Sequence, residues 1–272
     1  MLLHPASSAL TAFREGEMAR LCTVAVLAAL VGGCGGEAAR SGSASLEEGS
    51  AAYRAGQYQA AADQFTDYLQ AGPASPHQAE AYYYRGLAHV QLKERREALE
   101  DFQRAVQSRP PPDIESLASV AMGNLYFEDG ADAPAADAYI RGLRQPPPEL
   151  PQDRVLLRLA ISLQRMGRWG DADTYLARLI ERYPSTAAAT EARRRYRAGG
   201  FAVQTGAYAS GASALREAQR LRQAGFHARL APIVRNSQAL HAVQVGQVQT
   251  YAEAQALARR VNAAGFTAMV VP

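Results

Sequence analysis

The sequence contains little cysteine, and its histidines are scattered without the spacing of a catalytic or metal site. Only Cys22 and Cys34 occur among 272 residues, and both lie near the beginning of the chain. The five histidines show no spacing that would bring several of them onto one metal ion. A phosphate-binding glycine-rich loop and a GxSxG nucleophile motif are also missing. These absences argue against disulfides, metal sites, cofactors and catalysis, and they favour a protein that binds other molecules.

Long apolar runs are equally scarce. The run from Leu21 to Val31 is too short to cross a bilayer, which takes about 20 apolar residues. Arg20 precedes this run and small residues follow it, an order that is typical of an export signal. We therefore expect residues 1–33 to be a leader, with either Met1 or Met18 as the first translated residue.

The leader ends in VGGC, which resembles the lipobox of bacterial lipoproteins. The resemblance implies that Cys34 is lipidated and anchors the mature chain to a membrane, because several acyl chains together hold a protein stably. Gly35 after this cysteine implies the outer membrane, with the protein facing the periplasm. The alternative is an ordinary secretory signal that is cleaved near Gly33. Residues 34–44 are small and polar, and we expect them to form a flexible tether.

Residues 45–184 repeat with a period of 37. Each unit has a small residue, a second small residue 12 positions later, a large residue 4 positions after that and a proline 8 positions further on. Small residues let two helices approach closely, the large residue fills the space between them, and proline prevents the second helix from continuing. We therefore predict four helix-turn-helix units. The repeated positions are Gly49, Gly86, Gly123 and Ala160; Ala61, Ala98, Ala135 and Ala172; Phe65, Phe102, Tyr139 and Leu176; and Pro73, Pro110, Pro147 and Pro184.

This order of positions resembles the tetratricopeptide repeat, although the period of that family is about 34 residues and Lys93 replaces a turn glycine. The resemblance implies an α-solenoid with a concave groove that binds a protein or peptide partner. Alternatively, the groove residues only pack against neighbouring helices. Residues 185–200 are expected to form a capping helix, beginning at Ser185 or Thr186, and a linker. The groove positions that the resemblance indicates are Tyr53, Arg54, Tyr83, Leu87, Asn124, Phe127, Ile161 and Arg165.

The tail, residues 201–272, consists of two similar halves with an offset of 40. Each half has a short alternating run, FAVQTG or HAVQVG, then a helical pattern that ends in AGF, then a second apolar run. This order predicts a small α+β domain of the form βαββαβ, a four-stranded antiparallel sheet with both helices on one face. Strand alternation turns Val203, Val243 and Val245 toward the helices, and Gln204 and Gln244 toward the open face.

The motifs VQTGAY and AGF resemble the SPOR domain of bacterial envelope proteins, and the resemblance covers the whole tail. It implies binding of peptidoglycan glycan strands that lack stem peptides, and amide side chains suit the hydrogen-bonding groups of sugars. Seven arginines and two glutamates give the tail a charge of +5, against −2 for the rest of the chain, which favours the lactyl carboxylates of such strands. An exported domain without aromatic residues on its sheet face is not expected to bind nucleic acid. The glycan-binding positions are Gln204, Ala207, Leu240, Ala242 and Val270, with Gln244 and Arg229 as compensation because Ala207 and Ala242 replace the usual serine and arginine.

Three functions are compatible with these features. The first is a non-enzymatic envelope lipoprotein that links membrane, protein partner and cell wall during division or wall remodelling. The second is an assembly, secretion or pilus accessory lipoprotein in which the tail only localises the protein. The third is a wall glycosidase, which needs paired carboxylates in a cleft. The glutamates of the tail, Glu217 and Glu253, have no such companion in their halves, so the first function is the one we expect.

Overall fold

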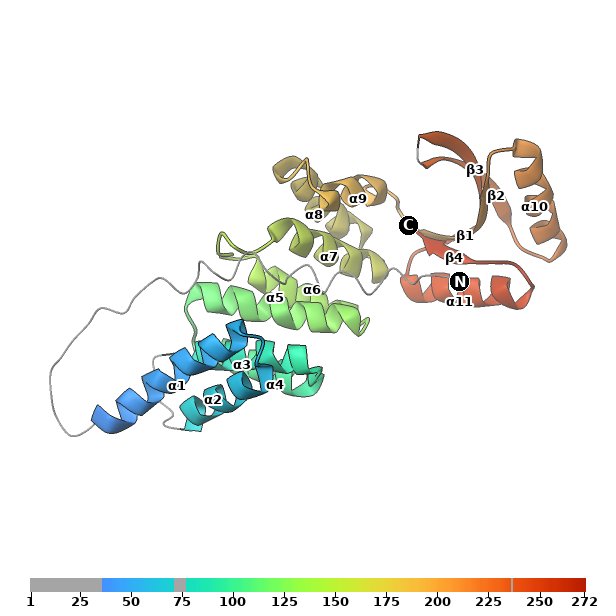
Figure 1. Cartoon of the computed structure of the whole chain (residues 1–272). Coiled ribbons are helices and arrows are strands. Elements are labelled where there is room, and N and C mark those ends of the chain that lie inside the picture. The colour runs from blue at the N-terminus through green and yellow to red at the C-terminus, as the bar shows by residue number, and fades with distance from the viewer. Residues whose placement is uncertain (1–35, 71–76, 236) are drawn as a thin grey trace.

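The computed structural model describes residues 36–70, 77–235 and 237–272, with side chains from residue 45 onward. Within these ranges a series of helices is followed by a small sheet with two further helices (Figure 1). The expected leader and Cys34 lie outside the described residues. The helices of the first part are α1 (Gly36–Arg54), α2 (Tyr58–Gln70), α3 (Gln78–Leu92), α4 (Arg95–Gln107), α5 (Pro112–Glu128), α6 (Asp132–Gly142), α7 (Gln152–Arg165), α8 (Trp169–Arg182) and α9 (Ala187–Arg195). The second part contains β1 (Phe201–Tyr208), α10 (Gly211–Gln223), β2 (Ala228–Arg235), β3 (Gln238–Val248), α11 (Tyr251–Ala263) and β4 (Met269–Val271).

Helices α1 to α8 form four successive pairs that stack into a solenoid (Figure 1). In the first three pairs a glycine of the first helix lies against an aromatic ring of the second. A Cβ atom placed on Gly86 would lie 2.7 Å from the ring of Phe102, which is closer than real Cβ contacts. The fourth pair has Ala160 and Leu176 at these positions, and both are fully buried. The predicted helix-turn-helix units are therefore confirmed, and the small residue of each unit is small because a ring or a leucine occupies the space beside it.

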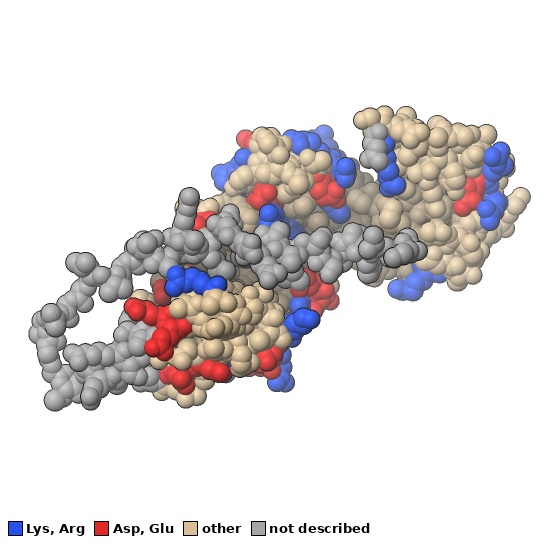
Figure 2. Space-filling view, in the orientation of Figure 1, with Lys and Arg blue, Asp and Glu red and all other residues tan. Residues whose placement is uncertain are grey.

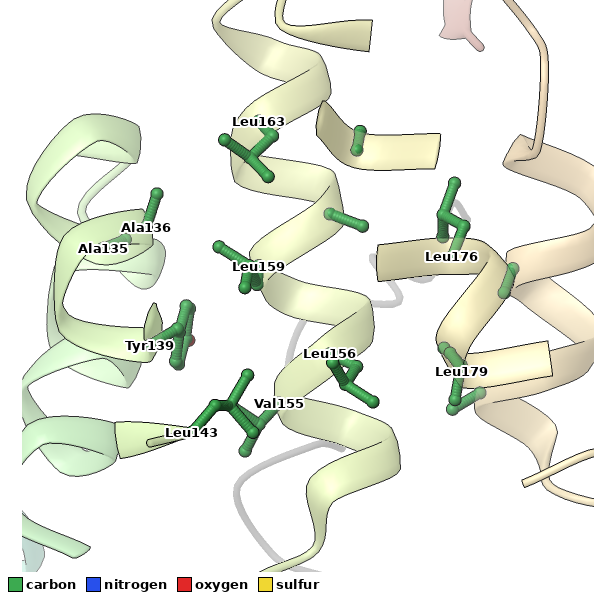
Figure 3. Packing of buried hydrophobic residues seen from close by; sticks show 14 of the residues in the cluster. Ala135, Ala136, Tyr139, Leu143, Val155, Leu156, Leu159, Leu163, Leu176 and Leu179 are labelled. Atoms are coloured by element: carbon green, nitrogen blue, oxygen red, sulfur yellow. The ribbon is translucent and has the colours of Figure 1, made fainter. Parts of the chain in front are cut away.

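The core at the end of the solenoid surrounds α7, which lies between α6 and α8 (Figure 3). Tyr139 of α6 and Leu176 and Leu179 of α8 are fully buried, together with Leu156 and Leu159 of α7. Full burial of such a side chain stabilises a protein by about 1.5–3 kcal/mol. The last repeat therefore has a strong apolar core even though it lacks the aromatic residue of the other three.

The turn inside each pair contains a residue with a left-handed backbone. Gly56, Gly130 and Gly167 have φ angles of 76°, 71° and 80°, and Lys93 has a φ angle of 65°. A residue with a side chain loses about 1–2 kcal/mol in this conformation. The structure thus confirms that Lys93 replaces the turn glycine, and it shows that the backbone keeps the same turn despite the replacement.

One segment differs from the expected boundaries, and another agrees with them. Residues 36–44, expected as a tether, belong to α1, because Glu37, Ala38, Ala39 and Arg40 are good helix formers that extend the first repeat helix toward its N-terminus. The capping helix α9 begins as predicted after Thr186, whose hydroxyl accepts a hydrogen bond from the backbone N–H of Ala189 at 3.1 Å. It ends at Arg195, before the glycines of the linker.

The tail forms a four-stranded antiparallel sheet with the strand order β2-β3-β1-β4. Helices α10 and α11 cover one face, where Val203, Val243 and Val245 pack against Leu221 of α10 and Val261 of α11. Thr250 and Glu253 form a capping box at the start of α11, and the hydrogen bond that the Thr250 backbone N–H donates to the Glu253 carboxylate lowers the pKa of that carboxyl. The predicted βαββαβ order and the position of both helices are confirmed.

None of the helices in the described part of the chain combines the length and the apolar character needed to cross a membrane. Within the same ranges, no three histidine, cysteine or carboxylate side chains lie together as a metal site.

Candidate functional site: an open sheet face and a helical groove

The face of the sheet opposite α10 and α11 carries a row of four side chains, one from each strand. Gln244 of β3 is paired with Arg229 of β2 on one side and with Gln204 of β1 on the other. Gln204 is in turn paired with Met269 of β4. Directly paired residues of an antiparallel sheet point to the same face. We call Arg229, Gln244, Gln204 and Met269 the amide row.

The amide row contains two glutamines whose side chains are largely buried. Gln204 and Gln244 are each 9% exposed, and neither side chain is hydrogen-bonded to another described residue. Each carboxamide has two donors and an acceptor available to a ligand that reaches the floor of the sheet.

A second row lies two residue pairs along β2 and β3 and consists of alanines. Ala242 of β3 is paired with Ala231 of β2 and Ala207 of β1. Ala207 is three positions from Gln204, so simple alternation would place it on the opposite face. An irregularity in the pairing at Thr205 returns Ala207 to the open face. The alanines form a shallow floor beside the amide row, bounded on the far side by the pair Ile233 and Leu240.

The open face brings together six of the seven residues predicted for glycan binding, namely Gln204, Ala207, Arg229, Leu240, Ala242 and Gln244. Val270 lies on the other face, because it is paired with Val203 and packs into the core beneath the helices. Met269 takes the corresponding position on the open face and is 50% exposed. The sequence signal for Met269 was weak, because β4 has only three residues and their alternation could not be assigned without the pairing.

Positive charge extends from the amide row along the edge strand β2. Arg229 and Arg235 are exposed and form neither an ion pair nor a hydrogen bond with another described residue. Figure 2 shows a notch between the α8–α9 end of the solenoid and the tip of the β2–β3 hairpin, with basic side chains at its hairpin side. Unpaired arginines beside a sheet that offers amide groups suit a ligand with both hydroxyl and carboxylate groups.

The groove positions fall into two classes. Tyr53 and Tyr83 are 8% and 7% exposed, and burial raises the pKa of both phenols. These two side chains build the wall between repeats. Leu87 is half-buried between the first and second repeats, whereas Arg54 is exposed.

The other groove positions lie at the end of the solenoid that is closest to the sheet domain. Asn124 accepts hydrogen bonds from the hydroxyl of Tyr139 at 2.9 Å and from Nη1 of Arg158 at 2.5 Å. The guanidinium of Arg165 lies 4.7 Å from the centre of the Phe127 ring. Ile161 is half-buried. This part of the groove is therefore lined by ordered polar and aromatic groups.

The sheet domain contacts the last repeat directly. The indole N–H of Trp169 donates to the carbonyl oxygen of Gln249 at 2.9 Å. The Trp169 ring meets Phe201 edge-on at 4.9 Å, and Phe201 meets Tyr251 at 5.6 Å. Arg165 of the groove also stacks on Tyr251, at 5.1 Å. An apolar cluster and a hydrogen bond thus join the groove and the sheet domain.

Family models recognise both parts of the chain. A model described as a SPOR domain matches residues 197–272, and two models described as tetratricopeptide repeat match residues 46–113 and 154–186. These are binding domains, which is consistent with a protein that is not an enzyme. A comparison with curated proteins found no match.

Solved structures are similar to the helical part of the chain. A structure titled for the functional characterization of Pseudomonas aeruginosa pilF is 20% identical over 57% of this chain and 67% of that chain, with a TM-score of 0.47. A tetratricopeptide repeat protein from Parabacteroides merdae is 16% identical over 57% of this chain and 59% of its own, with a TM-score of 0.49. YrrB, titled as a TPR protein with an unusual peptide-binding site, is 19% identical over 56% of this chain and 74% of its own, with a TM-score of 0.45. Identities this low describe the type of fold alone.

Proposed function

Because the chain combines tetratricopeptide repeats with a C-terminal SPOR domain, we propose that it is a non-enzymatic lipoprotein of the cell envelope that connects the cell wall to a protein partner. The SPOR domain suggests peptidoglycan binding, and the repeats suggest protein interaction. In the proposed function the open sheet face binds glycan strands that lack stem peptides. The groove recruits the partner, and the connection serves cell division or remodelling of the wall.

The observation that carries the glycan proposal is the amide row on an uncovered sheet face. Both helices of the domain lie on the other side of the sheet. Gln204 and Gln244 lie side by side and make no side-chain hydrogen bond to the part of the chain that the structure describes, so their amides can bind hydroxyl and acetamido groups. Arg229 is paired with Gln244 and is free for a lactyl carboxylate, which becomes available when the stem peptide is removed.

Loss of the two amides should abolish most of the glycan binding. We expect the full chain with Gln204→Ala and Gln244→Ala to bind amidase-treated sacculi at least about tenfold more weakly than the parent chain, because several hydrogen bonds are lost together. The measurement is co-sedimentation with amidase-treated and untreated sacculi over a range of protein concentrations. The parent chain should prefer the treated sacculi.

The matched control for this experiment is Gln255→Ala. Gln255 is exposed on α11, on the covered side of the sheet, so its loss should leave sedimentation unchanged. Thermal unfolding of each variant separates loss of the site from loss of the fold. If treated and untreated sacculi retain equal amounts of the parent chain, the proposed specificity for stem-peptide-free strands is wrong.

The lipid anchor is the part of the proposed function that depends on VGGC at residues 31–34. We expect a double-membrane bacterium that produces the chain to incorporate labelled palmitate into it and to place it in the outer membrane fraction. Cys34→Ser should remove the label, because the thiol is the acylated group, whereas Cys22→Ser should not. Retention of the label in Cys34→Ser would refute the lipidation.

A further inference from the structure

The exposed side of α7 carries a stripe of arginines that the glycan proposal does not use. Arg154, Arg158, Ile161 and Arg165 are spaced by four, three and four positions, so they lie on one side of the helix. Arg158 contacts Asn124, and Arg165 contacts Phe127, both of α5, so the stripe faces the groove. We call these four residues the arginine stripe.

Aromatic rings hold two of the arginines in place. Phe127 lies between them, with ring-centre distances of 5.6 Å to Arg158 and 4.7 Å to Arg165. Tyr251 of the SPOR domain stacks on Arg165 at 5.1 Å. A guanidinium that stacks on a ring through its flat face keeps its N–H groups at the edge, where they can bind carboxylates in pairs. Side chains ordered in advance lose less conformational entropy when a ligand binds.

The charge of the stripe is only partly neutralised. Among the described residues, Asp132 is the sole carboxylate within ion-pair distance of it, 3.4 Å from Nη1 of Arg165. Arg154 is exposed and its side chain has no partner in the described ranges, and Arg158 contacts two neutral groups, the side-chain oxygen of Asn124 and the hydroxyl of Tyr139. Each guanidinium has five N–H donors, more than these contacts occupy. A basic surface with ordered donors is complementary to carboxylates.

We propose that the arginine stripe and Tyr251 form a composite surface, shared by the last repeat and the SPOR domain, that binds an acidic segment of the partner protein. The proposal rests on the proposed recruitment of a partner through the groove and specifies the chemistry of that partner. Arg158 and Arg165 are seven residues apart on α7, which is roughly 10 Å along the helix axis. A chain in the polyproline II conformation covers this length in about three residues, and its side chains three positions apart point to the same side. The segment therefore carries acidic residues three positions apart.

The test uses the full chain and a fluorescein-labelled peptide with the repeat Glu-Gly-Ser. In this peptide the glutamates are three positions apart, and the uncharged version has glutamine in their place. We expect fluorescence anisotropy to show binding of the glutamate peptide, weakened by salt, and little binding of the glutamine peptide. Arg158→Gln and Arg165→Gln should each weaken binding about tenfold, since each removes charge-assisted hydrogen bonds.

Arg141→Gln is the matched control, because Arg141 is exposed on α6 and unpaired among the described residues. This substitution should change the affinity for the peptide less than about twofold. Loss of one charge-assisted contact, in comparison, should change it about tenfold. Tyr251→Ala should also weaken binding of the glutamate peptide if the SPOR domain shares the surface. Leu215→Ala on α10 should leave this binding unchanged. Equal binding of both peptides, or full binding by Arg158→Gln with unchanged thermal stability, would overturn the proposal. A crosslink to an envelope protein that is lost in Leu87→Glu but kept in Arg158→Gln would give a different result. It would support partner binding in the groove and would show that the partner does not bind through an acidic segment.

Discussion

Trp169→Ala is expected to release the SPOR domain from the solenoid and to lower the free energy of unfolding by about 3–5 kcal/mol. The indole is 8% exposed, packs on Phe201 and Ala254, and donates the hydrogen bond to Gln249. The substitution therefore removes a large buried ring and also leaves a carbonyl oxygen without its donor. Urea denaturation measures the loss of stability, and small-angle scattering measures the separation of the domains as an increased radius of gyration.

A second variant tests the same interface from the other side and uses Trp169, the single tryptophan of the chain, as the reporter. Phe201→Ala should shift the tryptophan emission to longer wavelength, because water reaches the indole when the opposite ring is removed. Leu215→Ala, an exposed position on α10, should leave the emission unchanged. An unchanged radius of gyration in Trp169→Ala would show that the domains stay together without this ring.

Gly86→Ala should destabilise the solenoid by about 1–3 kcal/mol, since a Cβ atom there has no space. The added carbon would lie 2.7 Å from the fully buried ring of Phe102, and the ring cannot move away without disturbing the second pair of helices. Phe102→Leu alone should also destabilise, by about 1–2 kcal/mol, because it leaves a cavity. The free energy of unfolding of each variant can be measured with urea.

The double variant Gly86→Ala, Phe102→Leu should lose about 1–2 kcal/mol less free energy of unfolding than the two single variants lose in total. This combination is the one that the fourth repeat already has in Ala160 and Leu176. Gly170→Ala on α8 is the control, because no heavy atom lies within 4 Å of the added carbon and alanine is the better helix former. If the two losses of stability simply add, the ring of Phe102 is not the reason that residue 86 must be small.

The repeats could be predicted from the sequence because the same pair of contacting positions recurs in every unit. Four glycines or alanines, each followed after 16 positions by a large residue, indicate one helix pair however the details of any single unit vary. The extent of α1 could not be predicted in this way. Residues 36–44 lie before the first repeated position, and their serines and glycines resemble a linker although they continue the helix.

The open face could be predicted only where strand alternation is regular. Gln204 and Gln244 were assigned correctly to the same face because each has a buried valine beside it. Ala207 reaches that face through the irregular pairing at Thr205, and Val270 is turned away from it in a strand of three residues. Both outcomes depend on the pairing between strands, which sequence spacing alone does not contain. Ile161 and Arg165 of the arginine stripe were among the predicted groove positions, whereas Arg154 and Arg158 were not. The contact of Arg165 with Tyr251 could not be predicted either, because it joins two domains.

The contact between Trp169 and Phe201 also determines which fragments of the chain can be soluble on their own. A fragment that starts at residue 201 would expose Phe201 and Tyr251, two rings that the last repeat now covers, and would be prone to aggregate for that reason. Transplanting the SPOR domain onto another protein therefore calls for a graft that keeps α8 and α9 attached. The smallest portable unit of this chain is larger than its sheet domain.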